Sequence, residues 1–144
     1  MPKVIEGSIT IPDSVASIGN GAFNFCARIT EINIPDGVTS IGKNAFEYCL
    51  SLERVTIPNT VTTMGEGAFS NCEKLKKIII PNGVTSIGQH AFWECKNLRS
   101  IIIPHSVTSF GEYAFTLCSK LKTITIPEHL KEYFKKFECK IIVK

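Results

Sequence analysis

The sequence repeats itself with a period of 23 residues. Ile-Pro pairs recur at this spacing at Ile57–Pro58, Ile80–Pro81 and Ile103–Pro104, and nearly every other apolar position around them follows the same period. Self-similarity at a period of roughly 20 to 50 residues is typical of chains that stack one supersecondary unit on the next. The period therefore limits the architecture before any single residue is interpreted.

Each repeat reads I-P-x-x-V-x-x-I-G-x-x-A-F-x-x-C-x-x-L-x-x-I-x. The alternation of apolar and polar residues in 32–34 and its copies predicts a half-buried strand. Proline ends that strand because it has no N–H for a ladder, and the β-branched stretch 38–41 predicts a second short extended piece. Gly42 and its copies are expected to allow a backbone reversal. The stretch 45–49 has room only for a single helical or 3-10 turn.

One such unit has apolar side chains but cannot enclose them, whereas stacked copies can. We therefore expect one solenoid domain over residues 1–144, with in-register strands. Its N-terminal strand is expected in 1–11, its five repeats in 12–126 and a C-terminal cap in 127–144. The cap prediction rests on a charged segment with helical spacing of apolar residues, followed by a last strand at 141–143; the apolar residues are Leu130, Tyr133, Phe134 and Phe137.

The repeat resembles the BspA-like (Treponema pallidum-type) class of leucine-rich repeats over residues 8–127, and the A-F-x-x-C block carries the resemblance. Small departures are Ile29 in the Leu column, and Met64 and Phe110 in the Ile column. The resemblance implies an α/β repeat fold: a right-handed leucine-rich-repeat solenoid with a curved parallel sheet on one face, and short second strands and helical turns elsewhere. It also implies surface-exposed or secreted proteins that adhere to host or matrix proteins, or to other cells.

Five of the six cysteines form one repeat column, at Cys26, Cys49, Cys72, Cys95 and Cys118. Stacked coils would space them about 5 Å apart. Parallel inward side chains have the wrong orientation for a disulfide, and no C-x-x-C spacing suggests zinc. We expect buried free thiols that act as small hydrophobes, and no metal or cofactor site. Cys139, outside the column, is expected in the cap, with a reactive thiol as the alternative.

The positions next to the inward isoleucines vary between copies while the core positions do not, so packing does not dictate them. Ile79 and Ile102 are adjacent outward apolar residues, which indicates either strand propensity at a tolerant site or an apolar anchor in a binding face. A protein-binding scaffold is the function we expect. The candidate protein-binding residues are Glu31, Asn33, Arg54, Thr56, Lys77, Ile79, Ser100, Ile102, Thr123 and Thr125.

Charge is distributed unevenly along the chain. Residues 73–144 contain twelve Lys/Arg against six Asp/Glu, and residues 1–72 contain four against seven. This asymmetry can steer an acidic partner, although a solvated charged surface is the more common meaning. The alternative function is polyanion binding, to sulfated glycan or nucleic acid, with nucleic acid the less expected of the two. Its candidate residues are Lys76, Lys77, Arg99 and Lys122.

The sequence gives no support for an enzyme. His90, His105 and His129 occupy variable positions, and no nucleophile–base arrangement or Gly-rich phosphate loop is visible. A third possibility is a structural spacer, or a truncated or artificial scaffold with no ligand of its own. An exposed first strand at Ile9 and Ile11 could also drive self-association. No run has the length of a membrane span, and the first residues do not resemble a signal peptide, so the resemblance and the sequence disagree on a cell-surface location.

Overall fold

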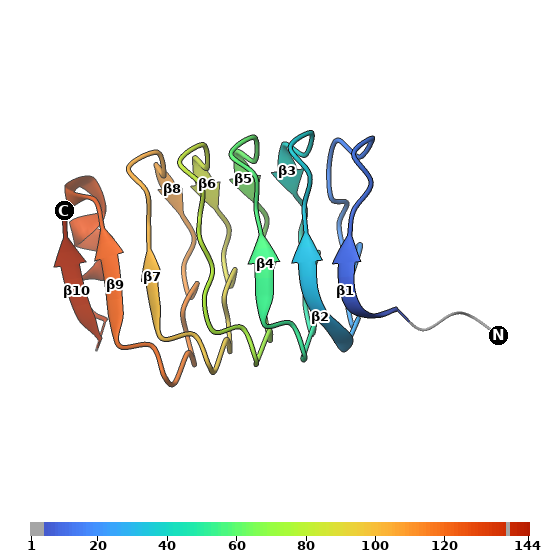
Figure 1. Ribbon diagram of the computed structural model, residues 1–144. Helices are drawn as coiled ribbons and strands as arrows, with labels where there is room; N and C mark the ends of the chain where they lie inside the picture. The colour runs from blue at the N-terminus through green and yellow to red at the C-terminus, as the bar shows by residue number, and fades with distance from the viewer. Residues whose placement is uncertain (1–4, 138) are drawn as a thin grey trace.

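The computed structural model describes residues 5–137 and 139–144, and it shows a solenoid in which each coil is one 23-residue repeat (Figure 1). Equivalent residues of neighbouring coils are paired: Glu31 with Arg54, and Ser100 with Thr123. Every strand pair among the described residues is parallel. The predicted repeat solenoid with in-register strands is confirmed. Of the expected N-terminal strand, 1–11, residues 1–4 lie outside the described residues, as does Glu138 of the expected cap.

One side of the solenoid, called the front sheet here, carries two parallel sheets with the orders β1-β2-β4 and β10-β9-β7 (Figure 1). Buried Ile101 lies between exposed Ser100 and Ile102, because successive side chains of a strand point to opposite faces. The strands are β1 (Glu6–Thr10), β2 (Arg28–Asn33), β4 (Arg54–Thr56), β7 (Ser100–Ile102), β9 (Thr123–Ile126) and β10 (Lys140–Val143).

A second sheet, called the back sheet here, runs without interruption in the order β3-β5-β6-β8. Each of its strands is only two residues long, which confirms the second short extended piece and shows how short it is. An isolated bridge between Ile18 and Ile41 extends the pairing to the first coil. The strands are β3 (Ser40–Ile41), β5 (Thr63–Met64), β6 (Ser86–Ile87) and β8 (Ser109–Phe110).

The front sheet, unlike the back sheet, is interrupted in its middle. The repeat pattern predicts a strand at 78–80, the copy of 32–34 and the equivalent of Ile101–Ile103, but the structure has none there. Main-chain hydrogen bonds such as Ile34 N to Thr56 O (3.1 Å) and Ile103 N to Thr125 O (2.8 Å) join other coils at this level. Residues 76–80 make none of these bonds to either neighbouring coil. The predicted strand is therefore wrong for this one coil.

Cross-strand charge supplies a physical reason for the interruption. In the 23-residue register, Lys77 faces Arg54 on one side and Lys76 faces Arg99 on the other. Like charges directly opposite one another destabilise strand pairing. The segment 76–80 thus carries a repulsive pair toward each neighbour, although Lys76 also faces Glu53 of the preceding coil. Arg99 and Lys122 also face each other, yet β7 and β9 remain paired, so two adjacent lysines distinguish the interrupted coil.

Two columns of left-handed residues shape the remaining side of each coil. Their φ angles lie between 54° and 64°. A single turn separates the two columns in each coil, closed for example by the hydrogen bond from Glu47 N to Asn44 O (3.2 Å). A positive φ cannot continue a right-handed helix, so the A-F-x-x-C block makes single turns and no helix. The columns are Gly21, Asn44, Gly67, His90 and Tyr113, and Phe25, Tyr48, Asn71, Glu94 and Leu117.

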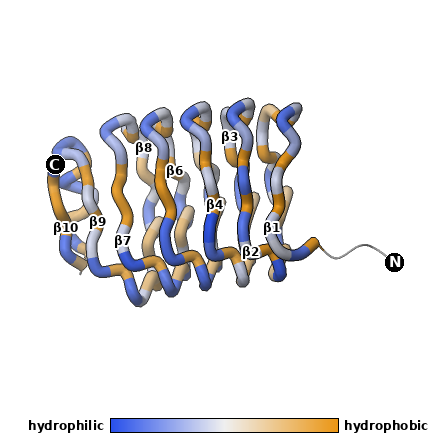
Figure 2. The backbone as a smooth tube through the Cα atoms, viewed as in Figure 1, coloured by the Kyte–Doolittle hydropathy of each residue, from blue (hydrophilic) through white to orange (hydrophobic). Residues whose placement is uncertain are grey.

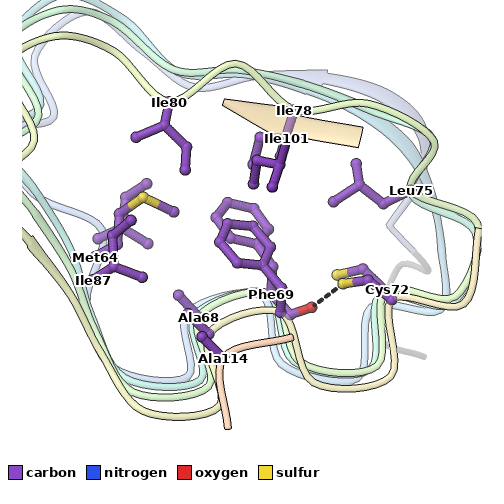
Figure 3. Packing of buried hydrophobic residues seen from close by; sticks show 14 of the residues in the cluster. Met64, Ala68, Phe69, Cys72, Leu75, Ile78, Ile80, Ile87, Ile101 and Ala114 are labelled. Atoms are coloured by element: carbon purple, nitrogen blue, oxygen red, sulfur yellow. Dashed lines mark hydrogen bonds between the residues drawn. The ribbon is translucent and has the colours of Figure 1, made fainter. Parts of the chain in front are cut away.

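A ladder of stacked phenylalanines fills the centre of the core (Figure 3). Phe46 and Phe69 lie with ring centroids 5.1 Å apart and planes 9° from parallel, and Phe69 and Phe92 are 5.8 Å apart. Phe23 and Phe115 extend the stack at its two ends. Because every coil adds one ring to the same stack, each coil completes the core of its neighbours.

The glycine column has a different role from the one predicted. Gly42 and its copies do not have positive φ, so they are not needed for a backbone reversal. A Cβ built on Gly42 would lie 2.7 Å from the backbone nitrogen of Asn20 in the preceding coil. Gly19, the first of the column, has nothing within 4 Å. The column therefore permits close stacking of coils at this level.

The last residues form a 3-10 helix, η1 (Glu128–Phe134), followed by β10. The buried side chains of η1 are Leu130 and Phe134, and the ring of Phe134 lies 5.1 Å from that of Phe110. β10 pairs with β9 over four residues, so the last coil presents η1 and β10 at this end of the solenoid (Figure 1).

Candidate binding face and its groove

The structure places the predicted binding residues on the outward side of the front sheet. Ser8, Glu31 and Arg54 are register partners in one column, and Thr10, Asn33 and Thr56 are partners in the next. In the second half of the sheet, Ser100 pairs with Thr123 and Ile102 with Thr125. The exposed members are Arg54, Thr56, Lys77, Ile79, Ser100 and Ile102, and the half-buried ones are Glu31, Asn33, Thr123 and Thr125.

A groove of about 620 Å³ lies over the interrupted part of this face. Its outward apolar side chains are Ile79 and Ile102, which are 69% and 65% exposed. Figure 2 shows β7 as a hydrophobic part of the front sheet, whereas β2 and β4 carry hydrophilic residues. The two isoleucines singled out from the sequence are thus brought together in a hollow.

The groove also contains residues that sequence reasoning missed. His105 and Ser106 enter it from the turn after Pro104, and Lys144 enters it from the residue after β10. The buried Ser106 Oγ has no hydrogen-bond partner in the described structure. The sequence did contain a sign for the first two: positions 105 and 106 vary between repeats and belong to the turn that follows the outward columns. Lys144 had no signal, since it lies outside the repeat.

Ion pairs cover the two halves of the front face unequally. Arg28 and Arg54 pair with Glu6 and Glu31 of the preceding coil, at 3.8 and 3.2 Å. Within 5–137 and 139–144, the four residues of the polyanion alternative make no ion pair. Lys76, Arg99 and Lys122 occupy one column of three successive coils, with Lys77 beside it. The structure therefore gathers the predicted basic residues into one uncompensated stripe.

The aromatic residues on the turn side form a separate surface. Phe25 and Tyr48 stack on each other at 4.8 Å, and His90 contacts both Trp93 and Tyr113. A second hollow of about 1010 Å³ lies at the C-terminal end, lined by Tyr113, Leu117, Tyr133, Phe137 and the thiol-bearing Cys118 and Cys139.

All six cysteines are free. The free thiols predicted for the column are confirmed, although Cys26 is only half-buried, and four of the five thiols also donate hydrogen bonds. Cys72 Sγ donates to the carbonyl of Phe46 and Cys95 Sγ to that of Phe69, each at 3.2 Å; Figure 3 marks a thiol–carbonyl bond of this column with a dashed line. Burial raises the pKa of Cys49 to about 12, with a smaller contribution from Cys26. Burial also raises the pKa of Cys72 and that of Cys95 well above the ordinary thiol value.

Most of these thiols are poorly placed to react. A thiol must ionise to act as a nucleophile or a metal ligand, and burial opposes ionisation along most of the column. No cluster of three or more His, Cys, Asp or Glu side chains that could hold a metal ion occurs among the residues described. The column instead ties each coil to the carbonyl of the preceding one.

A solenoid of short parallel strands that follow an L-x-x-I-x-I segment defines the leucine-rich-repeat class of proteins, which are generally non-enzymatic scaffolds. The sequence matches the BspA type leucine-rich-repeat region in six copies, over residues 6–92 and 39–140. The chain therefore belongs to the BspA-type leucine-rich-repeat family, which confirms the resemblance seen in the sequence. A comparison with curated protein sequences gave no match.

Three solved structures illustrate the similarity. The leucine-rich-repeat protein of T. pallidum is 28% identical with a TM-score of 0.80, over 82% of this chain and 57% of that one. A leucine-rich cell surface protein from Faecalibacterium prausnitzii is 39% identical with a TM-score of 0.80, over 83% and 31%. A leucine-rich-repeat protein from Bacteroides ovatus is 34% identical with a TM-score of 0.75, over 83% and 41%. The chain thus spans about a third to three fifths of the length of these proteins.

No helix among the described residues has both the length and the apolar character needed to cross a membrane.

Proposed function

We propose that the chain is a non-enzymatic scaffold that binds a protein through the outward side of the front sheet. The observation that carries the proposal is the groove of about 620 Å³ at Ile79 and Ile102. Exposed large apolar side chains gathered in a hollow are typical of interaction sites, whereas single scattered ones are not. The name of the F. prausnitzii cell surface protein supports a location at a cell surface, and the proposal adds adhesion to other proteins or cells.

The design of the fold supports this proposal. Buried columns repeat with little change from coil to coil, so the packing of the core does not depend on which residues occupy the outward columns. The outward side chains differ in charge, size and polarity from one coil to the next. A rigid, regular backbone that presents variable side chains in register is the arrangement that solenoid proteins use for extended binding surfaces.

The test is a binding measurement on the purified chain, by surface plasmon resonance, against fibronectin, laminin, fibrinogen and heparin at low and high salt. We expect binding to a protein that survives high salt, because apolar contacts are not screened. A variant with Arg54→Gln, Lys77→Gln, Ile79→Ser and Ile102→Ser should lose that binding while keeping the wild-type circular dichroism spectrum.

A matched control variant removes two exposed apolar side chains from a surface outside the groove. Leu50 and Leu117 are 38% and 55% exposed and do not line the groove. A Leu50→Ser/Leu117→Ser variant should bind as the wild type does. Binding that survives the fourfold variant would move the site to another surface. No binding at either salt concentration would favour the spacer function over the scaffold function.

A second candidate function, polyanion binding, is favoured by the uncompensated stripe of Lys76, Lys77, Arg99 and Lys122. Basic residues without carboxylate partners can neutralise sulfates or phosphates and release their counterions. For four neutralised charges, the logarithm of the heparin affinity should fall with the logarithm of the salt concentration with a slope of roughly −3. A slope near zero, or heparin binding unchanged in a Lys76→Gln/Lys77→Gln/Arg99→Gln variant, would reject this function.

A further inference from the structure

We infer that the groove at Ile79 and Ile102 takes an extended segment of a partner protein that carries carboxylates next to a branched aliphatic side chain. The inference rests on the proposed function and names the chemistry of its partner. It follows from three properties of the groove: its apolar centre, the sign of its charged groups, and the interruption of the sheet beneath it.

The apolar centre sets the first requirement. Ile79 and Ile102 stand on neighbouring coils, and the buried Ile78 and Ile101 beside them fix both side chains on the outward side. An aliphatic side chain laid between them would lose its own exposed surface and cover theirs. Burying one such side chain contributes enough free energy to change an affinity by about tenfold or more.

The charged groups of the groove set the second requirement. Lys77 and Lys144 line it, and no Asp or Glu is among the described residues that do so. Lys76 and Arg99 adjoin Lys77 in the stripe. The nearest arginine of the first half, Arg54, is already paired with Glu31, so the uncompensated positive charge is concentrated at the groove. A partner with carboxylates would complement this charge, whereas a basic partner would be repelled.

The interruption of the sheet adds the third property. The interruption leaves the segment 76–80 without ladder bonds to the neighbouring coils, so its side chains can adjust to a ligand at lower cost than those of a paired strand.

The same features distinguish a protein segment from other occupants. A sulfated glycan would satisfy the lysines but offers no aliphatic group to cover Ile79 and Ile102. A second copy of this chain would bring its acidic half, with four Lys/Arg against seven Asp/Glu in 1–72, but that half pairs Glu6 and Glu31 internally. A segment with both carboxylates and aliphatic side chains complements both the positive charge and the apolar centre of the groove.

The experiment is a selection of phage-displayed random octapeptides on the immobilised full chain. Parallel selections use an Ile79→Ser/Ile102→Ser variant and the control variant Leu50→Ser/Leu117→Ser. We expect the wild type and the control to enrich peptides in which Asp or Glu adjoins Ile, Val or Leu, and the groove variant not to enrich them. Enrichment of peptides without that combination, or of none, would overturn the inference.

Individual enriched peptides then separate the contributions. Replacing the aliphatic residue by Ser, or the acidic residues by Asn and Gln, should each weaken binding to the chain about tenfold in fluorescence anisotropy. Hydrogen exchange should slow at 76–80 and at β7 on binding. Equal affinity of the Ser-containing peptide, together with displacement by a heparin fragment, would show a polyanion site instead and reject the inference. Light scattering of the chain alone would detect self-association as the competing occupant.

The outcome is independent of the test of the proposed function. Salt-resistant binding of a whole matrix protein that the fourfold variant loses, without any enriched peptide, would keep the scaffold function and reject only the extended acidic segment. Failure of both measurements would reject both.

Discussion

Gly65 packs directly against Gly42, its equivalent in the preceding coil: a Cβ built on Gly65 would lie 2.7 Å from the carbonyl carbon of Gly42. The closest approach between coils on this side of the solenoid is therefore a contact of backbone with backbone. A side chain at this level has no flexible neighbour that could move away, so the whole coil spacing must change to admit it.

Gly65→Ala is predicted to lower the free energy of unfolding by about 1 to 3 kcal/mol, the range for overpacking a closely packed site. Gly19→Ala is the matched control, because it has the same place in the repeat, no positive φ and nothing within 4 Å. It should leave stability unchanged or raise it by up to about 1 kcal/mol, because alanine reduces the entropy of the unfolded chain. Urea unfolding followed by circular dichroism measures both. Equal effects of the two substitutions would show that the contact between coils is not the reason for the glycine.

Leu117→Gly is predicted to stabilise the protein, although it removes a large side chain. Leu117 has a φ of 62° and is 55% exposed, so it bears the steric cost of a left-handed conformation without the benefit of full burial. Glycine adopts this conformation freely but loses more chain entropy, so the net gain should be up to about 1 kcal/mol. The measurement is the urea midpoint.

Leu50→Gly provides the opposite case. Leu50 is 38% exposed and has no positive φ, so only the entropic cost of glycine applies and stability should fall by about 0.5 to 1 kcal/mol. A lower midpoint for both variants would indicate that the left-handed column is not strained at Leu117.

Stability is predicted to fall as pH rises above the ordinary thiol pKa of 9.0. The unfolded chain then loses thiol protons, whereas folded Cys49, with its pKa raised to about 12, and Cys72, raised further by burial, keep theirs. The unfolded state binds fewer protons, so each such thiol lowers the free energy of unfolding by about 1.4 kcal/mol per pH unit in this window. Below pH 9.0 both states are protonated and the effect is absent.

A Cys49→Ala/Cys72→Ala variant tests whether these two thiols cause the pH dependence. Lysines also titrate at high pH, but the variant and the wild type have the same lysines, so any difference between them comes from the thiols. Its unfolding free energy should depend less steeply on pH between about 9 and 11 than that of the wild type. An unchanged slope would show that these two thiols do not stay protonated in the folded state.

The sequence predicts the core better than the surface, and for a physical reason. Core positions such as Val61 and Phe69 must match their copies, so repetition reveals them directly. The left-handed columns were not predictable, because Phe25, Tyr48 and Leu117 are residue types that seldom adopt positive φ and only the ladder between coils imposes it. The close contact at the glycines depends on the coil spacing, which the sequence does not state.

The candidate site was predictable in part. The outward columns and the pair Ile79 and Ile102 follow from strand alternation alone. The interruption beneath them could also have been predicted from the sequence, because the 23-residue period itself aligns Lys76 with Arg99. The groove, by contrast, also depends on Ser106 and Lys144, whose positions are set by a turn and by the last strand.

The interruption predicts a local difference in hydrogen exchange. Ile34, Ile80 and Ile103 are equivalent, buried residues of three coils. The amides of Ile34 and Ile103 donate to the next coil at 3.1 and 2.8 Å, whereas that of Ile80 has no such bond. The Ile80 amide should therefore exchange at least about tenfold faster than the other two, because exchange needs no ladder to open first. Exchange of assigned amides by NMR measures the three rates. Comparable protection of all three amides would show that the front sheet is continuous in solution. The substitution Lys77→Glu places a carboxylate opposite Arg54. If charge repulsion causes the interruption, this substitution should slow hydrogen exchange of the Ile80 amide.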